Sequence, residues 1–508
     1  MFDGLGLLAT GITHFLTPIS LFNIVWATLL GIVIGALPGL TATMGVALLV
    51  TLTYKMDADQ AILCLMCIYS GAIYGGSRTA ILLAIPGTPA SAATTLDGHP
   101  LALQGKAGLA MGLATTSSAL GTIIGIVALA LIAPLLGEAA LRFGTYEFFW
   151  LALFGVVISG QLTAMDDPLK GYIAGILGLM VAMIGMETLH AHQRFTFGMP
   201  ALGGGIDLIP AMVGAFGFAE ILAVMKRSAQ ARIVSSSDRV VPSLGEVFKY
   251  WKTILRSGLI GTFVGIVPGV GEDVGSWASY AAAKRASKEP HMFGRGSQEG
   301  LIAAETGNSA VVPGAMIPTL TLALPGSAAA AVLIAAMFIH GIRPGPLLMT
   351  ESPETLYQIV AILLFSTLAI LAFGLTLTKP LLKVLSVPRE RLMAVVYVLC
   401  VVGSFAITQR LFDVYVMVAF GIIGFILREM KYPMAPLVLG IILGDLLDLN
   451  LRRGLLLTNG DPSPFFTRPI SAVICGIIVV TILMSIPAVS KRVRAVFNRT
   501  QTDGPGQG

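Results

Sequence analysis

Among the Pro-Gly pairs of this sequence, four that interrupt apolar stretches and are followed by small or hydroxyl residues are its clearest candidates for binding an ion. They are Pro38-Gly39, Pro86-Gly87, Pro268-Gly269 and Pro325-Gly326. Proline removes a backbone hydrogen bond from a helix, and glycine permits the irregular turn that follows. A helix that begins after the break points its free amides at the space in front of it, where an anion can bind, while freed carbonyl oxygens suit Na⁺. At any single pair, a packing kink is the alternative.

Small and hydroxyl residues follow these breaks and extend the candidate anion site. Asn308 and Ser309, in AAETGNSAVVPG, add an amide and a hydroxyl beside a carboxylate. Arg78, in YGGSRTAILL, can form a two-pronged ion pair with a carboxylate, although an arginine that reaches to lipid headgroups is the alternative. The predicted substrate-binding residues are Thr41, Thr43, Ser77, Arg78, Thr79, Gly87, Thr88, Asn308, Ser309, Gly326 and Ser327.

Three carboxylates are candidates for carrying a coupling ion, either Na⁺ or a proton. Glu272 and Asp273 follow the third Pro-Gly pair, and Glu305 lies in the apolar stretch before the fourth. Ionisable groups at membrane depth are expensive and are therefore functional candidates. At a turn open to water, Glu272 and Asp273 would instead be solvated side chains.

Other chemical motifs are weak. Cys64 and Cys67 form a CxxC in an apolar segment without a second pair, which favours core packing over metal binding. The sequence has no HExxH and no nucleotide-binding loop, so we expect no cofactor and no metal beyond the coupling ion.

The composition requires a membrane to position these residues. Charged residues make up 12% of the 508 residues and apolar residues 55%, with a mean hydropathy of +0.85. A soluble domain carries about 25% charged residues. The long apolar stretches predict an all-α polytopic membrane protein with about ten to twelve transmembrane helices. The net charge of +5 follows topology and gives no indication of nucleic-acid binding.

The chain also contains an internal repeat. GALPGLTATMG aligns with GIVPGVGEDVG, and TAILLAIPGTPASAA with TLTLALPGSAAAAV, in the same order and about 230 and 239 residues apart. We therefore divide the chain into a first transmembrane repeat (1–225), a basic cytoplasmic linker (226–256), a second repeat (257–490) and a cytoplasmic tail (491–508). Internal duplication is typical of secondary transporters.

Flanking charge predicts that the two repeats are inverted. The first Pro-Gly pair is flanked by few basic residues and the third by strongly basic loops, so the positive-inside rule places them on opposite sides. Arms of about 15 residues around the first pair favour re-entrant hairpins, with kinked full spans as the alternative. Arg452 and Arg453 fall in a loop that the alternation of successive spans places outside the cell. Either the predicted number of spans is wrong there, or these arginines have a role other than setting topology.

Taken together, these segments resemble a known family. GALPGLTATMGVALL, YGGSRTAILLAIPGTPASAATTLDGHPLALQGKAG, RFTFG, GIVPGVGEDVGSWASYAAAKRASK, EGLIAAETGNSAVVPGAMIPTLTLALPGSAAAAVL and LRRGLLLTNGDPSPFFTRPIS occur in the order found in the large membrane subunit, TctA, of the tripartite tricarboxylate transporters. The resemblance covers nearly the whole chain up to about residue 491. Before the paired arginines, Asp445 and Asp448 stand where the family tends to have glutamates.

The resemblance implies a permease of the bacterial inner membrane. Such a permease imports citrate or related carboxylates on a Na⁺ or H⁺ gradient, with a small transmembrane subunit and a periplasmic solute-binding protein as partners. Three alternatives stay open: an intramembrane enzyme, a carboxylate permease that needs no binding protein, and a channel or scaffold. An enzyme would need an acid-base pair or metal cluster at membrane depth, and no such motif is evident.

Overall fold

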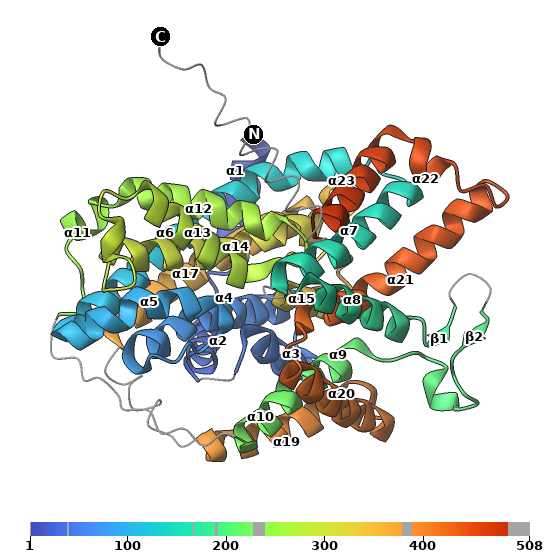
Figure 1. Cartoon of the computed structure of the whole chain (residues 1–508), viewed down its shortest axis with the longest axis horizontal. Helices are drawn as coiled ribbons and strands as arrows, with labels where there is room; N and C mark the ends of the chain where they lie inside the picture. The colour runs from blue at the N-terminus through green and yellow to red at the C-terminus, as the bar shows by residue number, and fades with distance from the viewer. Residues whose placement is uncertain are drawn as a thin grey trace, which may run out of the picture.

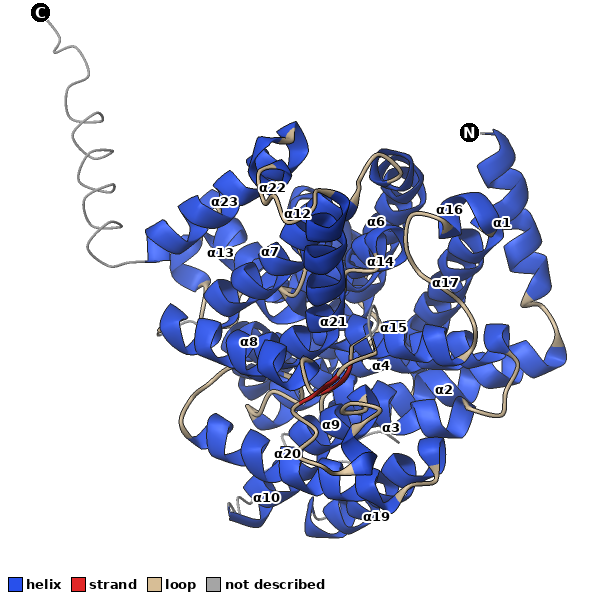
Figure 2. Ribbon diagram, turned by 90° about the vertical axis from the view of Figure 1, so that its right-hand side faces the viewer, coloured by secondary structure: helices blue, strands red, loops and turns tan. Residues whose placement is uncertain are grey.

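The computed structural model confirms the predicted all-α fold (Figure 1). It describes residues 2–37, 40–164, 167–187, 191–226, 239–377 and 389–485, so Pro38, Gly39 and the predicted tail lie outside the described residues. Within that range nearly all regular structure is helical. The described strands are β1 (Gly185–Met186) and β2 (Gln193–Arg194), a short antiparallel pair visible in red in Figure 2.

The helices follow one another in two successions. The first succession is α1 (Phe2–His14), α2 (Pro18–Ala36), α3 (Ala42–Thr53), α4 (Ala58–Leu83), η1 (Pro89–Ser91), α5 (Ala92–Leu101), η2 (Ala102–Lys106), α6 (Ala107–Ala140), α7 (Thr145–Thr163), α8 (Pro168–Ala182), η3 (Pro200–Leu202), α9 (Leu208–Met212), η4 (Val213–Phe218) and α10 (Ala219–Lys226). The second is α11 (Leu244–Phe248), α12 (Trp251–Ile266), α13 (Gly271–Ala286), η5 (Pro290–Met292), α14 (Gln298–Leu322), α15 (Ala328–Ile339), α16 (Leu348–Glu351), α17 (Pro353–Thr376), α19 (Arg389–Thr408), α20 (Leu411–Glu429), α21 (Met434–Leu457), α22 (Pro464–Thr467) and α23 (Pro469–Ser485).

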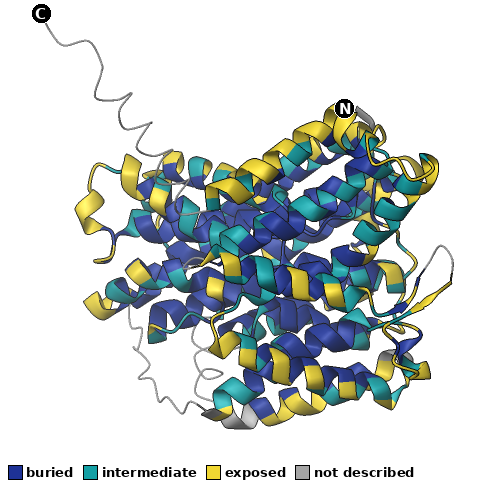
Figure 3. Ribbon diagram, turned by 45° about the vertical axis from the view of Figure 1, so that its right-hand side comes forward, coloured by how far each residue is buried: buried dark blue, intermediate teal, exposed yellow. Residues whose placement is uncertain are grey.

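Eight helices in the described part of the chain are long and apolar enough to cross a membrane. Five shorter apolar helices, of 10 to 17 residues, accompany them. The predicted ten to twelve spans fall between the eight alone and both sets together. The surface agrees with a lipid environment, because many large apolar side chains are exposed. Figure 3 shows exposed residues along the outer helices.

The helices on either side of the first Pro-Gly pair, α2 and α4, lie against each other. A Cβ on Gly31 would meet the backbone of Ile68, and one on Gly35 would meet the carbonyl oxygen of Ala72, so α2 runs parallel to α4. Since α3 connects these two parallel helices, it must run back between them. The predicted arm length was wrong for α2, because its 19 residues exceed the expected 15, whereas α3 has only 12.

The second half repeats this hairpin contact for contact. Gly261 approaches the backbone of Gly307, and Gly265 approaches the carbonyl oxygen of Val311. Gly261 and Gly265 are the counterparts of Gly31 and Gly35 at the sequence offset of 230 residues. Gly307 and Val311 are the counterparts of Ile68 and Ala72 at the offset of 239 residues. α12 is thus parallel to α14, and α13 returns beside both.

The fourth helix of each repeat ends in the same way. α4 ends at Ala84 and α14 at Ala323, each in the left-handed conformation with φ of 55°. The cap amides bond to the carbonyls of Thr79 and Pro318. A left-handed alanine is uncommon, so its recurrence at both breaks supports a duplicated architecture.

The two halves interlock in one core. α6 and α5 of the first half pack on α14, α7 and α8 pack on α21, and α20 packs on η4 and α10. α4 and α14 lie at the centre, and nearly all of their residues are buried. The segment predicted as a linker, residues 226–256, contains α11 and the first turns of α12; its residues 227–238 lie outside the described range.

Arg452 has a role in tertiary structure. Its guanidinium bonds to Glu187, beside β1, at 2.9 Å and to Asp448 at 2.9 Å, while Arg194 on β2 bonds to Asp448 at 3.0 Å. These ion pairs attach the β-hairpin to α21, so Arg452 has a role other than setting topology.

Candidate functional site

A cavity of about 920 Å³ gathers residues from all four helix breaks. Thr41, Ala42 and Thr43 come from the first break, and residues 85–90 from the second. Residues 269–273 come from the third break, and Ala328 follows the fourth. Segments separated by up to 287 positions thus meet at one space, as the aligned sequence repeats predict.

Helix N-termini face this cavity. α3 begins at Ala42, α13 at Gly271 and α15 at Ala328, and all three residues line the space. The first amides of a helix have no partner within it and carry about half a positive charge in total. Three such ends make the cavity favourable for an anion without requiring a full cation at each end.

The two breaks of the second half are bonded to each other. The amide of Gly269 donates to the carbonyl of Pro325 at 3.0 Å, and that of Gly271 to Gly326 at 3.1 Å. Both donors have φ of 74°, a conformation that glycine adopts without a Cβ clash. These bonds hold the tip of the α12–α13 hairpin against the start of α15.

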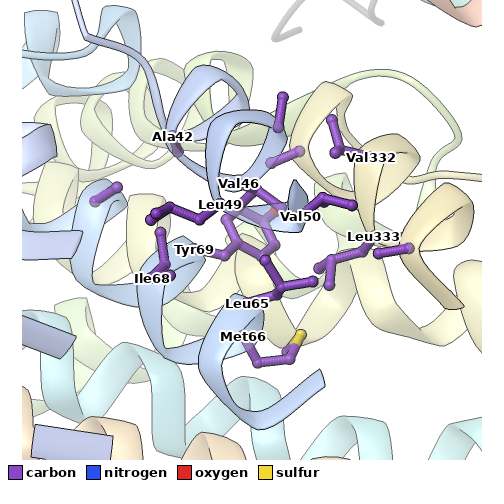
Figure 4. Close-up of a cluster of buried hydrophobic side chains, with 14 of the residues drawn as sticks. Ala42, Val46, Leu49, Val50, Leu65, Met66, Ile68, Tyr69, Val332 and Leu333 are labelled. Carbon is purple, nitrogen blue, oxygen red and sulfur yellow. The ribbon is translucent and has the colours of Figure 1, made fainter. Parts of the chain in front are cut away.

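Tyr69 of α4 reaches across to this tip. Its hydroxyl donates to the Glu272 carboxylate and is 2.8 Å from Ser327 Oγ. Figure 4 shows the Tyr69 ring among apolar side chains of α3, α4 and α15, including Val46, Leu65 and Val332. The apolar packing fixes the ring, and so the hydroxyl is held at the carboxylate.

Glu305 is the centre of a second polar cluster. It is fully buried in α14. Ser77 and Ser118 donate to its Oε2 at 2.7 and 2.9 Å, and Thr94 donates to Oε1. Three hydroxyls from α4, α5 and α6 therefore hold a carboxylate in the protein interior.

Arg78 turns away from the cavity. Its guanidinium donates to the Tyr74 hydroxyl and to the carbonyl of Gly374 at 2.8 Å, and it lies 5.2 Å from the centre of the Tyr74 ring. Arg78 is absent from the described cavity lining. The structure thus places it between α4 and α17, separate from the other predicted anion ligands.

The remaining predicted residues divide between the cavity and its supports. Thr43, Thr88, Glu272 and Asp273 line the cavity together with Thr41, which also caps α3 through Met44 N at 3.2 Å. Pro86, Gly87 and Gly269 also line it, and Gly87 lies against the carbonyl of Gly35. The supporting residues are Thr79, which bonds to Gly76; Gly326, which lies against the carbonyl of Gly265; Pro268 and Pro325 at the breaks; and Ser327, which caps α15.

Asn308 and Ser309 are deeply buried in α14 without hydrogen-bond partners among the described residues. Ser309 lines a separate cavity of about 10 Å³ together with Ser70, whose hydroxyl is likewise without a partner in the described chain. A space of that size holds about one water molecule.

A charged rim lies at the edge of the large cavity. Arg428 pairs with Glu220, and Glu429 and Lys431 line the same edge. These rim residues, and also Tyr69, Ser70, Thr94 and Ser118, are not among the site residues predicted from the sequence. Tyr69 and Ser70 could have been found by extending the second aligned repeat backwards, since they align with Asn308 and Ser309.

The fold and the cavity together define a class of membrane protein. A polytopic helical protein in which duplicated, broken helices meet at a cavity has the architecture of a secondary transporter. The chain belongs to the tripartite tricarboxylate transporter TctA family, whose profile matches residues 21–439. The resemblance stated from the sequence is thereby confirmed.

Two proteins of Agrobacterium vitis are similar to this chain. An uncharacterised 52.8 kDa protein in the TAR-I ttuC' 3' region is 34% identical, over 98% of this chain and 99% of its own length. An uncharacterised protein in the TAR-II ttuC' 3' region is 34% identical, over 47% of this chain and 98% of its own length. No solved structure matches the chain.

Proposed function

We propose that this chain is the permease subunit that imports citrate or a related carboxylate through the cavity between its two hairpins. The observation that carries the proposal is the meeting of three helix N-termini and four Pro-Gly breaks at one cavity of about 920 Å³. Family membership supports a tricarboxylate as the substrate class.

Import of such an anion needs a coupling ion. Each negative charge that enters against an inside-negative potential costs about 2.3 kcal/mol per 100 mV, so a trivalent anion is not accumulated on its own. Glu272 and Asp273 at the cavity, and Glu305 in the neighbouring cluster, are the proposed carriers of Na⁺ or H⁺.

The proposed assembly follows the family name. A small transmembrane subunit and a periplasmic solute-binding protein complete the transporter in the bacterial inner membrane, with the C-terminus of this chain in the cytoplasm. The binding protein captures the carboxylate and delivers it to the cavity. The two repeats face opposite sides of the membrane in this proposal.

Uptake into proteoliposomes tests the function. The chain is reconstituted with its small subunit, a binding protein is added, and labelled citrate and a panel of di- and tricarboxylates are supplied under inward Na⁺ or H⁺ gradients. We expect accumulation only when both the gradient and the binding protein are present. Equilibration of the carboxylate down its own gradient without accumulation would indicate a channel, and gradient-driven accumulation without the binding protein would indicate a self-sufficient permease.

A further inference from the structure

The two halves of the site differ at one aligned position in a way that suggests where the substrate binds. The contact offsets of about 230 and 239 residues make Ala42 the counterpart of Glu272, Thr88 that of Ser327, and Asn308 that of Tyr69. The second half therefore has a carboxylate where the first half has only a methyl group.

In the second half this carboxylate is enclosed by polar partners. Glu272 accepts a hydrogen bond from Tyr69, and the same tyrosine hydroxyl is 2.8 Å from Ser327 Oγ. All three side chains are buried. The chain itself thus supplies the anion that fills this half of the site.

In the first half the corresponding polar groups have no resident anion. Asn308 is fully buried, and neither its Nδ2 nor its Oδ1 has a hydrogen-bond partner among the described residues. A buried amide without partners is unfavourable, and a bound ligand can satisfy it. Ala42 and Thr88 both line the large cavity. The repeat relates Asn308 to Ala42 and Thr88 as it relates Tyr69 to Glu272 and Ser327, and on this equivalence a ligand at Ala42 and Thr88 lies within reach of Asn308.

A second aligned pair supports the equivalence of these positions. Glu305 of α14 accepts a hydrogen bond from Thr94 of α5. At the offset of 239 residues, Met66 is the counterpart of Glu305 and Leu333 is the counterpart of Thr94. Met66 of α4 and Leu333 of α15 belong to the same apolar cluster, both are labelled in Figure 4, and the two helices pack on each other. In addition α14 packs on η1, directly after Thr88, as α4 packs on α15.

We propose that a carboxylate group of the substrate binds in the first half at the position that Glu272 occupies in the second. Asn308 Nδ2 and the Thr88 hydroxyl donate to it, and the N-terminal amides of α3 face it. Ala42 keeps the position open because its side chain is too small to fill it. This assignment rests on the proposed function for the identity of the ligand, but its geometry is testable without a substrate.

The A42E variant tests this assignment, because it introduces a carboxylate into the first half at the counterpart of Glu272. Its matched control is A42Q, which has the same size without the charge. Thermal melting of the purified full chain is measured for both, each with and without N308A. We expect A42E to melt at a higher temperature than A42Q, and N308A to abolish the difference. Equal melting of A42E and A42Q would overturn the assignment, as would a gain that persists in N308A, since the α3 dipole alone would then explain it.

Binding of citrate and related carboxylates provides the second readout. We expect A42E to lose the stabilisation that ligand gives the unmodified chain, with affinity reduced by about tenfold or more. N308D, which keeps the size of Asn308 but repels an anion, should show a similar loss, and it decides the question if A42E does not fold. Affinity within about twofold of the unmodified chain in N308D would overturn the assignment. A third outcome separates this assignment from the proposed function. If no carboxylate stabilises the unmodified chain but the higher melting temperature of A42E still depends on Asn308, then the proposed substrate class is wrong and the anion subsite is retained.

Discussion

Asp97 joins the two halves of the molecule through four hydrogen bonds. Its Oδ1 accepts from the amides of Gly294, Gly296 and Ser297 at 2.8 to 2.9 Å, and its Oδ2 accepts from the Tyr280 hydroxyl at 2.8 Å. Asp97 is fully buried in α5, whereas its partners belong to α13 and the loop before α14. A single carboxylate thus ties an element of the first half to a loop of the second.

Replacing Asp97 by alanine should therefore destabilise the whole chain. D97A leaves the two buried amides of Gly296 and Ser297 and the more exposed amide of Gly294 without their acceptor, which we expect to cost about 3 kcal/mol or more. The measurement is thermal melting in detergent. D57A is the matched control, because Asp57 is exposed and its side chain makes no cap hydrogen bond. If D97A melted with the unmodified chain, the role of Asp97 as the link would be wrong.

The proposed role of Glu305 in carrying the coupling ion can be tested by replacing this single residue. In E305Q the surrounding hydroxyls of Ser77, Thr94 and Ser118 can exchange donor and acceptor roles, so we expect the fold to survive. If the charge carries the coupling ion, gradient-driven uptake should fall by about tenfold or more. S77A, which keeps the charge and removes one donor, is the control. Unchanged ion dependence of uptake in E305Q would exclude Glu305 as the carrier.

At the scale of helices, close backbone contacts between the broken segments position the cavity. A Cβ on Gly87 would lie 2.1 Å from the carbonyl oxygen of Gly35, and one on Gly326 would lie 2.4 Å from that of Gly265. These two contacts are equivalent under the repeat. Each break is therefore seated on the hairpin of its own half through a glycine that admits no side chain.

G87A and G326A should each force these helices apart. Relief of a backbone overlap costs about 1–3 kcal/mol in a packed core. Because both contacts lie beside the cavity, we also expect ligand binding to weaken with stability. G476A is the control, since its Cβ would meet no atom within 4 Å in α23. A full retention of stability in G87A would show that the break does not rest on Gly35.

The sequence predicted these elements better than it predicted individual side chains. The Pro-Gly breaks, the repeat offsets and the buried cysteines could be read from the residue pattern, because helix breaks and apolar runs are local properties. The orientation of Arg78 could not, since it depends on Tyr74 and on a carbonyl of α17 almost 300 positions away. Tyr69 reads as an ordinary core aromatic until α15 brings Ser327 to its hydroxyl.

At the scale of the whole molecule, neither half has a complete core of its own. α6 of the first half packs on α14 of the second, α21 of the second packs on α7 and α8, and η4 packs on α20. The large cavity likewise needs both halves, since it is lined by Thr43 from one and Asp273 from the other. The two repeats are thus related by duplication, but they fold as a single cooperative unit.

Expression of the chain as two pieces tests this interdependence. We expect residues 1–232 and 233–508, expressed together, to assemble into a complex that survives affinity purification in detergent through a tag on one piece. Each piece expressed alone should aggregate or be degraded, because its share of the interface is unpaired. Two pieces that fold separately and do not associate would contradict the interlocked core.

Protection of a cavity cysteine by substrate tests the central claim most directly. In a chain whose native cysteines have been replaced, A223C places a thiol on the cavity lining, and A139C places one on an exposed turn of α6 away from it. The rate of maleimide labelling is measured with and without citrate or another carboxylate that the reconstituted transporter accumulates. We predict that the transported carboxylate slows labelling of A223C and leaves A139C unchanged. Equal labelling of A223C with and without a carboxylate that is transported would contradict the assignment of this cavity as the substrate site.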